Sequence, residues 1–465
     1  MRLKCAKVTL CVALFGHNFA VAQYGRGGGD WLTDGADAQR SGWVKNDPHI
    51  SVESVAAGAM QPLWKIKLNG APTAPVVASR LITYKGFKDL LFVSTSGDNV
   101  VAIDHALGKV FWETHLPYDS LLVPVKNGTE TCPAGMTAGL ALAGPAAMVI
   151  PAPAPEVPRA PAPIPTLPRP KRIPAVVYAL SSDGLIHTLN QHTGTDIGPA
   201  FRFIRGNAKA HDLISVGNQI YAVTSDHCGE VANGVWSINM DDTLVTEQRT
   251  GDASVLGLAF GVDSVFATTT EGIEALDAKT LKVTRQEPYG SGAGTSPLVF
   301  KFKDKEYVAS GNLSGHVFLM DSVSLGLLVN VPGKGAKLGS AFASWEDADS
   351  HARWLLTVKD GKVVAFKVVE QNGSVALEPG WTSRELVSPA APIVVNGVVF
   401  ALSSGSRTAG AVLYALDGAT GKELWNSGKV MGSYSTTGIS AGASKVYVGT
   451  HDGMLYAFGY LLNRE

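Results

Sequence analysis

Between positions 211 and 230 the chain carries two histidines and three carboxylates that could act together. These residues are His211, Asp212, Asp226, His227 and Glu230. Imidazole nitrogens and carboxylate oxygens are ligands for transition metals, so the group could bind a metal ion or take part in binding an anionic ligand. The spacing matches no established ligand pattern, however, so the sequence also allows ordinary solvated loop residues.

Two glycine-rich segments have the composition of phosphate-binding loops. GSGAGTS begins at Gly290, and GKGAKLG begins at Gly333. A nucleotide loop joins a strand to a helix, whereas both segments fall in links between predicted strands, so neither predicts a nucleotide site. The sequence also lacks the HExxH motif of metalloproteases.

The elements that must position these residues are short strands in a recurring unit. AIDHALGKVFW at residues 102–112 and ALDGATGKELW at residues 415–425 are nearly the same. Each unit has three apolar strands with tight Gly or Asp turns and a polar turn into a fourth. The third strands end at Asp104, Asn190, Asn239, Asp277, Asp321, Lys367, Asp417 and Phe458, with spacings of 38 to 50 residues after Asn190. Four short strands per unit is the size of a propeller blade.

The pattern predicts an all-β, eight-bladed β-propeller of four-stranded antiparallel blades. The last unit has strands at residues 436–441, 445–450 and 453–458 but no fourth strand. PLWKIKL at residues 62–68 supplies that strand, and an N-terminal strand completing the last blade would close the ring and remove its open edges. Seven blades remain an alternative, because the boundaries between residues 117 and 210 are obscured.

The N-terminus has the features of a secretory signal peptide. Basic residues precede an apolar run at residues 8–15, and Ala20-Val21-Ala22 forms a small-residue cleavage site. The apolar run is too short for a membrane anchor, which is the alternative. We therefore predict cleavage after Ala22 and a periplasmic or secreted protein, with an N-terminal extension at residues 23–60 and one propeller domain at residues 61–465.

Residues 145–174 hold eleven of the 25 prolines, and so predict an extended, solvated loop inside blade two. With Arg159, Arg169, Lys171 and Arg172 this insertion could be a recognition arm. The alternative is a tolerated surface insertion, because loops accept extra residues at little cost.

The charge balance excludes some classes of partner. The formal net charge is −1, and removal of Arg2, Lys4 and Lys7 with the signal peptide would make it −4. Such a balance gives no electrostatic reason to expect nucleic acid or anionic lipid. No segment is long and apolar enough to span a membrane, and we expect a monomer.

The repeats support a resemblance to a known family. DWLTDGADAQRSGW at residues 30–43 followed by LWKIKL, the two AxDxxxGxxxW units, and VYVGTHDGMLYAF near the C-terminus are similar to the repeats of PQQ-binding-like β-propeller proteins. Quinoprotein alcohol dehydrogenases and the assembly lipoprotein BamB share this type of propeller. The resemblance covers almost all of the mature chain and implies eight blades.

The tryptophans of the repeat have a mechanical role. Trp64, Trp112 and Trp425 lie on the outermost strands, where their large faces can pack between neighbouring blades. Middle blades depart from the motif, since Arg285 stands where the tryptophan would be. We therefore expect these three tryptophans to be structural.

Pyrroloquinoline quinone with calcium is the cofactor that the resemblance implies. The dehydrogenases of this type hold the cation with a Glu, Asn and Asp set, use a catalytic Asp, and have a disulfide between adjacent cysteines. This chain has no adjacent cysteines and no CxxCH haem site, and no carboxylate set aligns with the family motifs. We therefore predict a non-catalytic exported binding or scaffold protein with an envelope or secreted protein partner. The alternative is a PQQ-dependent alcohol or sugar dehydrogenase with a diverged site.

Cys132 and Cys228 remain after Cys5 and Cys11 leave with the signal peptide. Cys132 lies in the predicted link between blades one and two, and Cys228 in an enlarged hairpin of blade three. In a propeller, such links and hairpins emerge on the same face. An exported protein favours oxidation, so the sequence predicts a disulfide, with two free thiols as the alternative.

Overall fold

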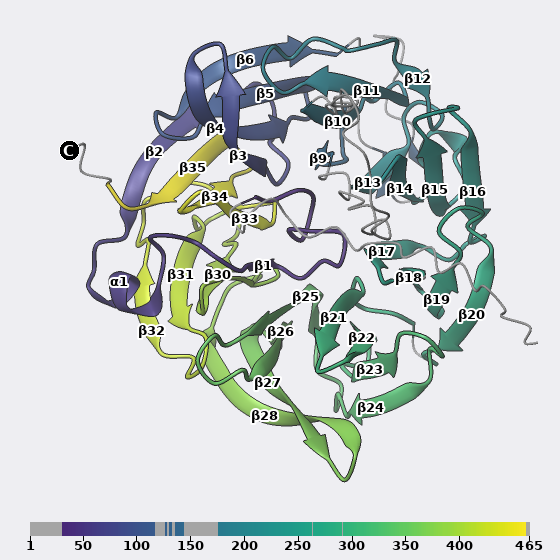
Figure 1. Cartoon of the computed structure of the whole chain (residues 1–465), viewed down its shortest axis with the longest axis vertical. Helices are drawn as coiled ribbons and strands as arrows, with labels where there is room; N and C mark the ends of the chain where they lie inside the picture. The colour runs from purple at the N-terminus through teal and green to yellow at the C-terminus, as the bar shows by residue number, and fades with distance from the viewer. Residues whose placement is uncertain are drawn as a thin grey trace, which may run out of the picture.

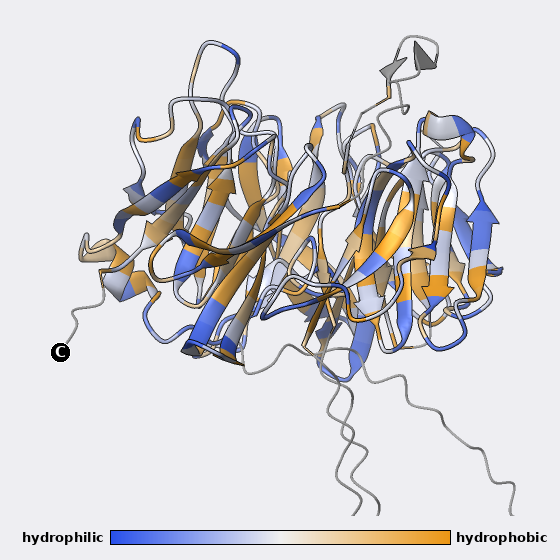
Figure 2. Ribbon diagram, turned by 90° about the horizontal axis from the view of Figure 1, so that it is seen from above, coloured by the Kyte–Doolittle hydropathy of each residue, from blue (hydrophilic) through white to orange (hydrophobic). Residues whose placement is uncertain are grey.

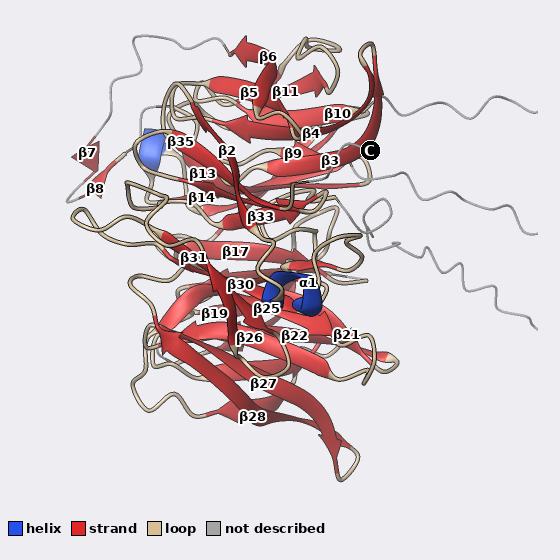
Figure 3. Ribbon diagram, turned by 90° about the vertical axis from the view of Figure 1, so that its left-hand side faces the viewer, coloured by secondary structure: helices blue, strands red, loops and turns tan. Residues whose placement is uncertain are grey.

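The computed structural model arranges the chain as eight four-stranded antiparallel sheets around a central channel (Figure 1). It describes residues 30–116, 126–127, 130–132, 135–143, 175–262, 264–290 and 292–461. The expected signal peptide and the proline-rich insertion lie outside the described residues. Figure 3 shows that strands dominate the described chain. The predicted all-β, eight-bladed propeller is therefore confirmed, and the seven-bladed alternative is wrong.

Blades one to four follow one another along the chain. Blade one consists of β3 (Val76–Thr83), β4 (Gly86–Ser94), β5 (Asn99–Asp104) and β6 (Lys109–His115). Blade two consists of β9 (Ala141–Leu142), β10 (Val176–Leu180), β11 (Leu185–Asn190) and β12 (Phe201–Arg202). Blade three consists of β13 (Lys209–Val216), β14 (Gln219–Ser225), β15 (Gly234–Asn239) and β16 (Val245–Arg249). Blade four consists of β17 (Val255–Phe260), β18 (Val265–Thr269), β19 (Gly272–Leu276) and β20 (Val283–Pro288).

Blades five to seven continue in the same order. Blade five consists of β21 (Leu298–Phe302), β22 (Lys305–Gly311), β23 (Val317–Asp321) and β24 (Leu327–Val331). Blade six consists of β25 (Leu338–Glu346), β26 (Arg353–Lys359), β27 (Lys362–Gln371) and β28 (Ser374–Glu385). Blade seven consists of β29 (Ile393–Val395), β30 (Val398–Ser403), β31 (Val412–Asp417) and β32 (Glu423–Asn426), and the short strand β1 (Trp43–Val44) pairs with β29 in parallel.

Blade eight joins the two ends of the chain. Its inner strands are β33 (Ile439–Gly442), β34 (Lys445–Gly449) and β35 (Met454–Gly459), and its outer strand is β2 (Gln61–Lys67). β2 pairs antiparallel with β35, so the N-terminal strand completes the last blade as predicted. Outside the blades lie the short helix α1 (Val52–Ala56), the 3-10 turn η1 (Cys228–Glu230) and the hairpin of β7 (Lys126–Asn127) and β8 (Glu130–Thr131).

The hydrophobic core lies mainly between neighbouring blades. The β-branched and aromatic residues that alternate along the strands pack into clusters that each draw on adjacent sheets, and Phe92, Phe266 and Phe400 are almost completely buried. Seen from the side, apolar residues concentrate in the strands and polar residues in the loops (Figure 2). The ring is thus held by the contact of each sheet with the next.

The tryptophans of the outer strands fix the contact between blades. The indole Nε1 of Trp64 in blade eight donates to the carbonyl of His105 in blade one at 3.0 Å. Trp112 in blade one donates in the same way to Gln191 in blade two at 2.9 Å. Trp381 in blade six, which the sequence pattern did not reveal, donates to Gly418 in blade seven at 2.8 Å.

Each of these three indoles packs on a glycine of the next blade. A Cβ atom added to Gly108, Gly194 or Gly421 would lie 2.5 Å from the facing tryptophan ring. These glycines have φ angles of 63°, 73° and 74°, which glycine adopts without strain. Close approach and backbone conformation therefore both require glycine.

Two positions vary this arrangement. Trp425 of blade seven faces blade eight, where its ring lies 5.9 Å from that of Phe458 in an edge-on contact. Arg285 of blade four donates through its guanidinium to the carbonyl of Val323 in blade five, and also to Ser264 Oγ at 2.8 Å. The arginine thus supplies by hydrogen bonding the contact that tryptophan makes elsewhere.

Candidate functional site

The N-terminal segment at residues 30–44, here called the channel segment, lies inside the ring. Figure 1 shows it in purple, crossing the centre of the propeller. It contacts the inner strands of blades one to seven in ring order. The bonds are Trp31 with Val77, Leu142 N to Leu32 O, Thr33 Oγ1 to Leu213 O, Phe260 N to Ala38 O, Val299 N to Gln39 O, Ser344 N to Ser41 O and Val394 N to Gly42 O.

Tight turns let the channel segment follow the inside of the ring. Gly35 and Gly42 have φ angles of 78° and 60°, and the amide of Gly42 donates to the carbonyl of Gly35 at 2.9 Å. The Asp37 carboxylate accepts from the Ser41 amide at 3.0 Å and from its hydroxyl at 2.6 Å. These bonds are outweighed by burial, which raises the pKa of the Asp37 carboxyl.

A buried ion pair anchors the channel segment to blade three. The Arg40 guanidinium lies 2.8 Å from the Asp212 carboxylate, and both side chains are more than nine-tenths buried. Arg40 also pairs with the half-exposed Asp34 at 3.2 Å. Burial by itself raises the pKa of Asp212, but Arg40, His211 and the Leu258 amide outweigh it and hold that pKa well below its usual range. The Asp212 carboxylate therefore stays ionised, and Arg40 balances its buried charge.

The channel opens on two faces of the propeller. The link face carries the links between blades and the hairpins that join second to third strands, and the turn face carries the remaining turns. On the link face a cavity of about 370 Å³ lies beside the channel segment. Its wall is formed by Trp31, Asp34 and Arg40 on one side and by hydroxyls such as those of Ser340, Ser404 and Thr436 on the other.

The link-face cavity does not fit a calcium-bound quinone. Calcium takes six to eight oxygen ligands, several of them carboxylates. Among the described residues that line the cavity, Asp34 is the one carboxylate, and Arg40 already neutralises it. The remaining lining groups are hydroxyls, main chain and apolar side chains. More generally, the described residues contain no group of three or more His, Cys, Asp or Glu side chains placed to hold a metal ion.

On the turn face, Trp43 separates two hollows. A small cavity of about 160 Å³ contains Asp37, and a groove of about 650 Å³ runs between blades six and seven. Two cations lie over the Trp43 ring, with Lys45 Nζ 5.0 Å and the Arg353 guanidinium 5.5 Å from its centroid. Burial lowers the pKa of Lys45, while Arg353 pairs with Glu346 at 2.7 Å. The turn-face groove therefore combines an aromatic surface with fixed charges.

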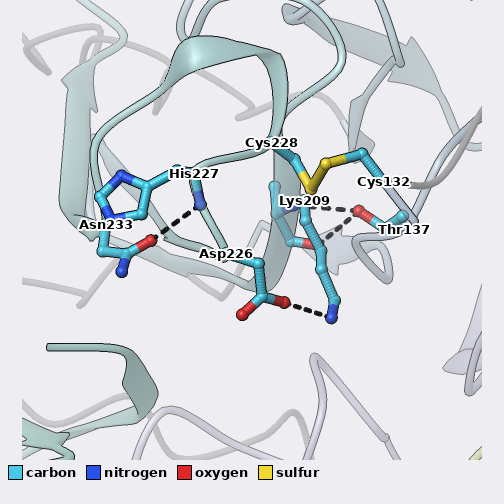
Figure 4. The surroundings of a disulfide bond; sticks show 8 residues. Cys132, Thr137, Lys209, Asp226, His227, Cys228 and Asn233 are labelled. Carbon is cyan, nitrogen blue, oxygen red and sulfur yellow. Dashed lines mark hydrogen bonds and ion pairs between the residues drawn. A yellow bond between two sulfur atoms is a disulfide. The ribbon is translucent and has the colours of Figure 1, made fainter. Parts of the chain in front are cut away.

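The five polar residues singled out in the sequence do not converge. Asp212 lies in the channel against Arg40, with His211 Nδ1 3.6 Å from its carboxylate. Asp226 pairs with Lys209, as Figure 4 shows. His227 Nε2 lies 3.7 Å from Asp252, and its amide donates to Asn233; Glu230 pairs with Arg205 at 2.9 Å. The three carboxylates of the group thus pair with three different cations, Arg40, Lys209 and Arg205.

Cys132 and Cys228 form a disulfide beside this hairpin (Figure 4). Their Cα atoms are 5.4 Å apart, and both residues are buried. The bond ties the link between blades one and two to blade three. Thr137 strengthens the same contact, because its hydroxyl donates to the Ala210 carbonyl at 2.7 Å and accepts from the Ala210 amide at 3.0 Å. The link face is thus cross-linked over three blades.

The described residues include no helix with the length and apolar character required to cross a bilayer. No family model matches the sequence, and no curated protein matches it either. Solved structures do match. Quinohemoprotein alcohol dehydrogenase from Comamonas testosteroni has a TM-score of 0.60 at 12% identity, over 94% of this chain and 82% of that one.

Two further structures show the range of proteins with this architecture. A europium-containing methanol dehydrogenase has a TM-score of 0.61 at 12% identity, over 93% of this chain and 98% of that one. BamB from Moraxella catarrhalis has a TM-score of 0.51 at 13% identity, over 87% and 99%. At such identities the likeness concerns the fold. The chain therefore has the eight-bladed propeller fold of the PQQ type that its repeats resemble.

Proposed function

We propose that this chain is an exported, non-catalytic propeller that serves as a binding scaffold for an envelope or secreted protein. The observation that carries the proposal is the channel segment. A ligand over the channel axis needs side chains that reach it from the inner strands, whereas here residues 30–44 bond to seven of those strands, six through their main chain and one through the Thr33 hydroxyl.

The charges inside the channel support the same proposal. Arg40 and Asp212 satisfy each other in a buried pair, and Asp34 is drawn to the same guanidinium. A catalytic carboxylate must accept a proton from its substrate near neutral pH, and the depressed pKa of Asp212 makes it a poor base. These groups hold the channel segment in place.

The alternative function is a PQQ-dependent oxidoreductase with a diverged site. It is favoured by the fold shared with alcohol and methanol dehydrogenases. A shared fold is a weak argument for a shared activity, because one fold can carry many unrelated functions. Export is likewise proposed from the N-terminal sequence, and an oxidising compartment suits the Cys132–Cys228 disulfide.

One experiment separates the two functions. Purified mature protein is titrated with pyrroloquinoline quinone and calcium, and quinone absorbance and dye-linked alcohol and sugar oxidation are measured. The scaffold proposal expects no saturable, calcium-dependent change. A saturable change with turnover would overturn it, and loss of that turnover on chelation would establish the oxidoreductase.

A cross-linking experiment tests for the partner directly. A photoreactive residue is placed in the turn-face groove at Ala348, which is exposed, and a matched one at the exposed Ala409 on the link face. Whole cells are irradiated and adducts are identified by mass spectrometry. The proposal expects a discrete protein adduct from at least one face, with a different yield from the other. Equal, diffuse labelling from both positions would contradict a specific scaffold.

A further inference from the structure

The hairpin of blade one carries three large apolar side chains into solvent. Ile82 is 72% exposed, Tyr84 is 71% exposed and Phe87 is 78% exposed. They belong to β3, β4 and the turn between them, here called the blade-one hairpin. Figures 1 and 3 show this hairpin at the rim of the ring, on the turn face. Scattered exposed apolar residues are ordinary, but three on one hairpin are not.

The backbone holds these side chains outward. Ile82 and Phe87 are direct cross-strand partners in the antiparallel register. A bulge between Ala78 and Leu81 sets this register, with Arg80 at a φ of 56° and its amide donating to Asp89 Oδ1 at 2.7 Å. Cross-strand partners share a face of a sheet, so the bulge turns Ile82 and Phe87 together toward solvent.

Side-chain hydrogen bonds hold the tip of the hairpin. The Thr83 hydroxyl donates to the Gly86 carbonyl at 2.8 Å and accepts from the Lys85 amide at 3.1 Å. Gly86 has a φ of 89°, which suits the residue that follows a tight turn. The exposed side chains are therefore presented by an ordered element.

The apolar surface continues onto the neighbouring strand of the blade. The rings of Tyr84 and Phe111 lie 5.6 Å apart, and Leu107 and Val110, which precede Phe111 in the β5–β6 region, are also exposed. The patch therefore consists of the hairpin tip and the β5–β6 turn beside it.

The charges around the patch are mainly positive. Arg80, Lys85 and Lys109 are exposed, and Lys85 Nζ lies 4.8 Å from the Phe111 centroid. Of the nearby carboxylates, Asp104 is buried and paired with Lys88 at 2.8 Å. Asp89 is partly buried and accepts the Arg80 amide. The chain as a whole has a net charge of −1, so this positive rim is local.

We propose that the blade-one hairpin docks the propeller onto an anionic lipid surface. Ile82, Tyr84 and Phe87 enter the headgroup region, while Arg80, Lys85 and Lys109 pair with lipid phosphates. Apolar insertion and cationic attraction act together in peripheral membrane binding. A protruding tip fits a deformable bilayer, whereas a protein partner would have to offer a matching pocket. The net charge gave no reason to expect anionic lipid, because it averages over this local excess.

Vesicle flotation tests the proposal on the purified mature chain. Vesicles of phosphatidylcholine alone and of phosphatidylcholine with phosphatidylglycerol are compared at low and high salt. We expect binding to the anionic vesicles that weakens at high salt, as screened charges require. Absence of binding to anionic vesicles, or equal binding to both compositions, would overturn the proposal.

Variants assign the binding to the hairpin. Ile82→Ser with Phe87→Ser should weaken binding about tenfold or more, since each removes most of an inserted apolar side chain. Lys85→Glu with Lys109→Glu should abolish the preference for anionic vesicles. Leu313→Ser is the matched control, because Leu313 is 67% exposed on blade five, and it should bind as the parent chain does. Equal losses in the control would contradict the assignment.

A fluorescently labelled variant reports insertion directly, so the test does not depend on a loss of binding that misfolding could also cause. Phe87→Cys, with an environment-sensitive fluorophore, should shift its emission to shorter wavelength on anionic vesicles, and Leu313→Cys should not. If only a purified envelope protein produces this shift, the patch is a protein interface and the lipid proposal fails. The outcome is independent of quinone binding, so this proposal and the proposed function can fail separately.

Discussion

At the scale of single residues, the chain relies on a few buried charges that have specific partners. Arg40 and Asp212 are the clearest pair, because each side chain is more than nine-tenths buried and their atoms are 2.8 Å apart. Removing one partner of such a pair leaves the other as an uncompensated buried charge.

Arg40→Met should therefore lower the free energy of unfolding by about 3–5 kcal/mol. Asp34→Asn is the matched control, since Asp34 contacts the same guanidinium at 3.2 Å but is half exposed. It should cost less than about 1 kcal/mol. Urea unfolding followed by fluorescence measures both. Similar losses of unfolding free energy in the two variants would show that burial does not set the energetic contribution of the Arg40–Asp212 pair.

A second buried group makes stability depend on pH. His105 lies between blades one and eight, with Nε2 2.6 Å from the Ala443 carbonyl oxygen and 3.0 Å from Lys445 Nζ. Burial, with repulsion from Lys445, lowers the pKa of His105 to about 4, and Asp89 and Asp104 offset this in part. Burial likewise lowers the pKa of Lys445 to about 8.

The unfolded chain therefore binds more protons at His105 than the folded chain between pH 4 and its ordinary value of 6.5. Stability should rise with pH across this window and fall on acidification toward pH 4. Thermal unfolding from pH 4.5 to 7 should show this slope, and His105→Asn should flatten it. An unchanged slope in the variant would assign the pH dependence to other groups.

At the scale of elements, the contact between blades depends on pairing a tryptophan with a glycine in the next blade. Trp112 packs on Gly194, where an added Cβ would lie 2.5 Å from the ring. Blade five instead has Leu325 in the corresponding turn, with a φ of 60°, and the facing strand of blade four has Arg285, which donates to the Val323 carbonyl of that turn. The outer-strand residue of one blade and the turn residue of the next blade therefore differ together.

Gly194→Ala should thus destabilise the protein by about 2 kcal/mol or more, through both the clash and the positive φ angle. Gly217→Ala is the control: Gly217 has a φ of 59° but no atom within 4 Å of an added Cβ. It should show the backbone cost alone, about 1 kcal/mol. Denaturant midpoints give the difference. Equal effects would mean that contact with Trp112 contributes nothing.

The elements also show what the sequence can and cannot predict. Blade number, the composite last blade and the hairpin turns follow from local alternation and turn residues. Trp381 was missed because the long β27–β28 hairpin separates it from the Asp-Gly turns that mark the other units. The polar group near Asp226 was one candidate reading of the sequence beside ordinary solvated loop residues, and its three carboxylates pair with three different cations. Arg40 comes from the channel segment, far along the chain, whereas Lys209 and Arg205 lie on and just before β13, and the sequence pattern alone does not assign any of these pairs.

At the scale of the whole molecule, the ring is closed twice by the N-terminal region. β2 completes blade eight from outside, and the channel segment joins the inner strands of blades one to seven. The sequence predicted the first closure, because a strand was missing. The sequence did not predict the closure by the channel segment, because nothing in residues 30–44 distinguished them from an ordinary N-terminal extension.

The second closure should contribute much of the cooperativity of the fold. A chain beginning at Lys45 loses the buried Trp31, the Arg40–Asp212 pair and the bonds to seven blades, while it keeps β2 and all eight sheets. Truncating a buried tryptophan alone costs about 3–5 kcal/mol. Leaving Asp212 unpaired costs about 3–5 kcal/mol more, so we expect the free energy of unfolding of the Lys45 chain to be lower by about 6–10 kcal/mol, with a broader transition.

A chain beginning at Asp30 keeps every one of these contacts and is the matched control. It should unfold like the mature protein in urea, and hydrogen exchange of the inner strands should be unchanged. In the Lys45 chain, the inner-strand amides Phe260, Val299, Ser344 and Val394 lose their acceptors and should exchange faster, while the outer strands stay protected. Uniform loss of protection would mean that the segment acts on global folding alone. Faster exchange confined to the inner strands would establish that the channel is built by the segment that fills it.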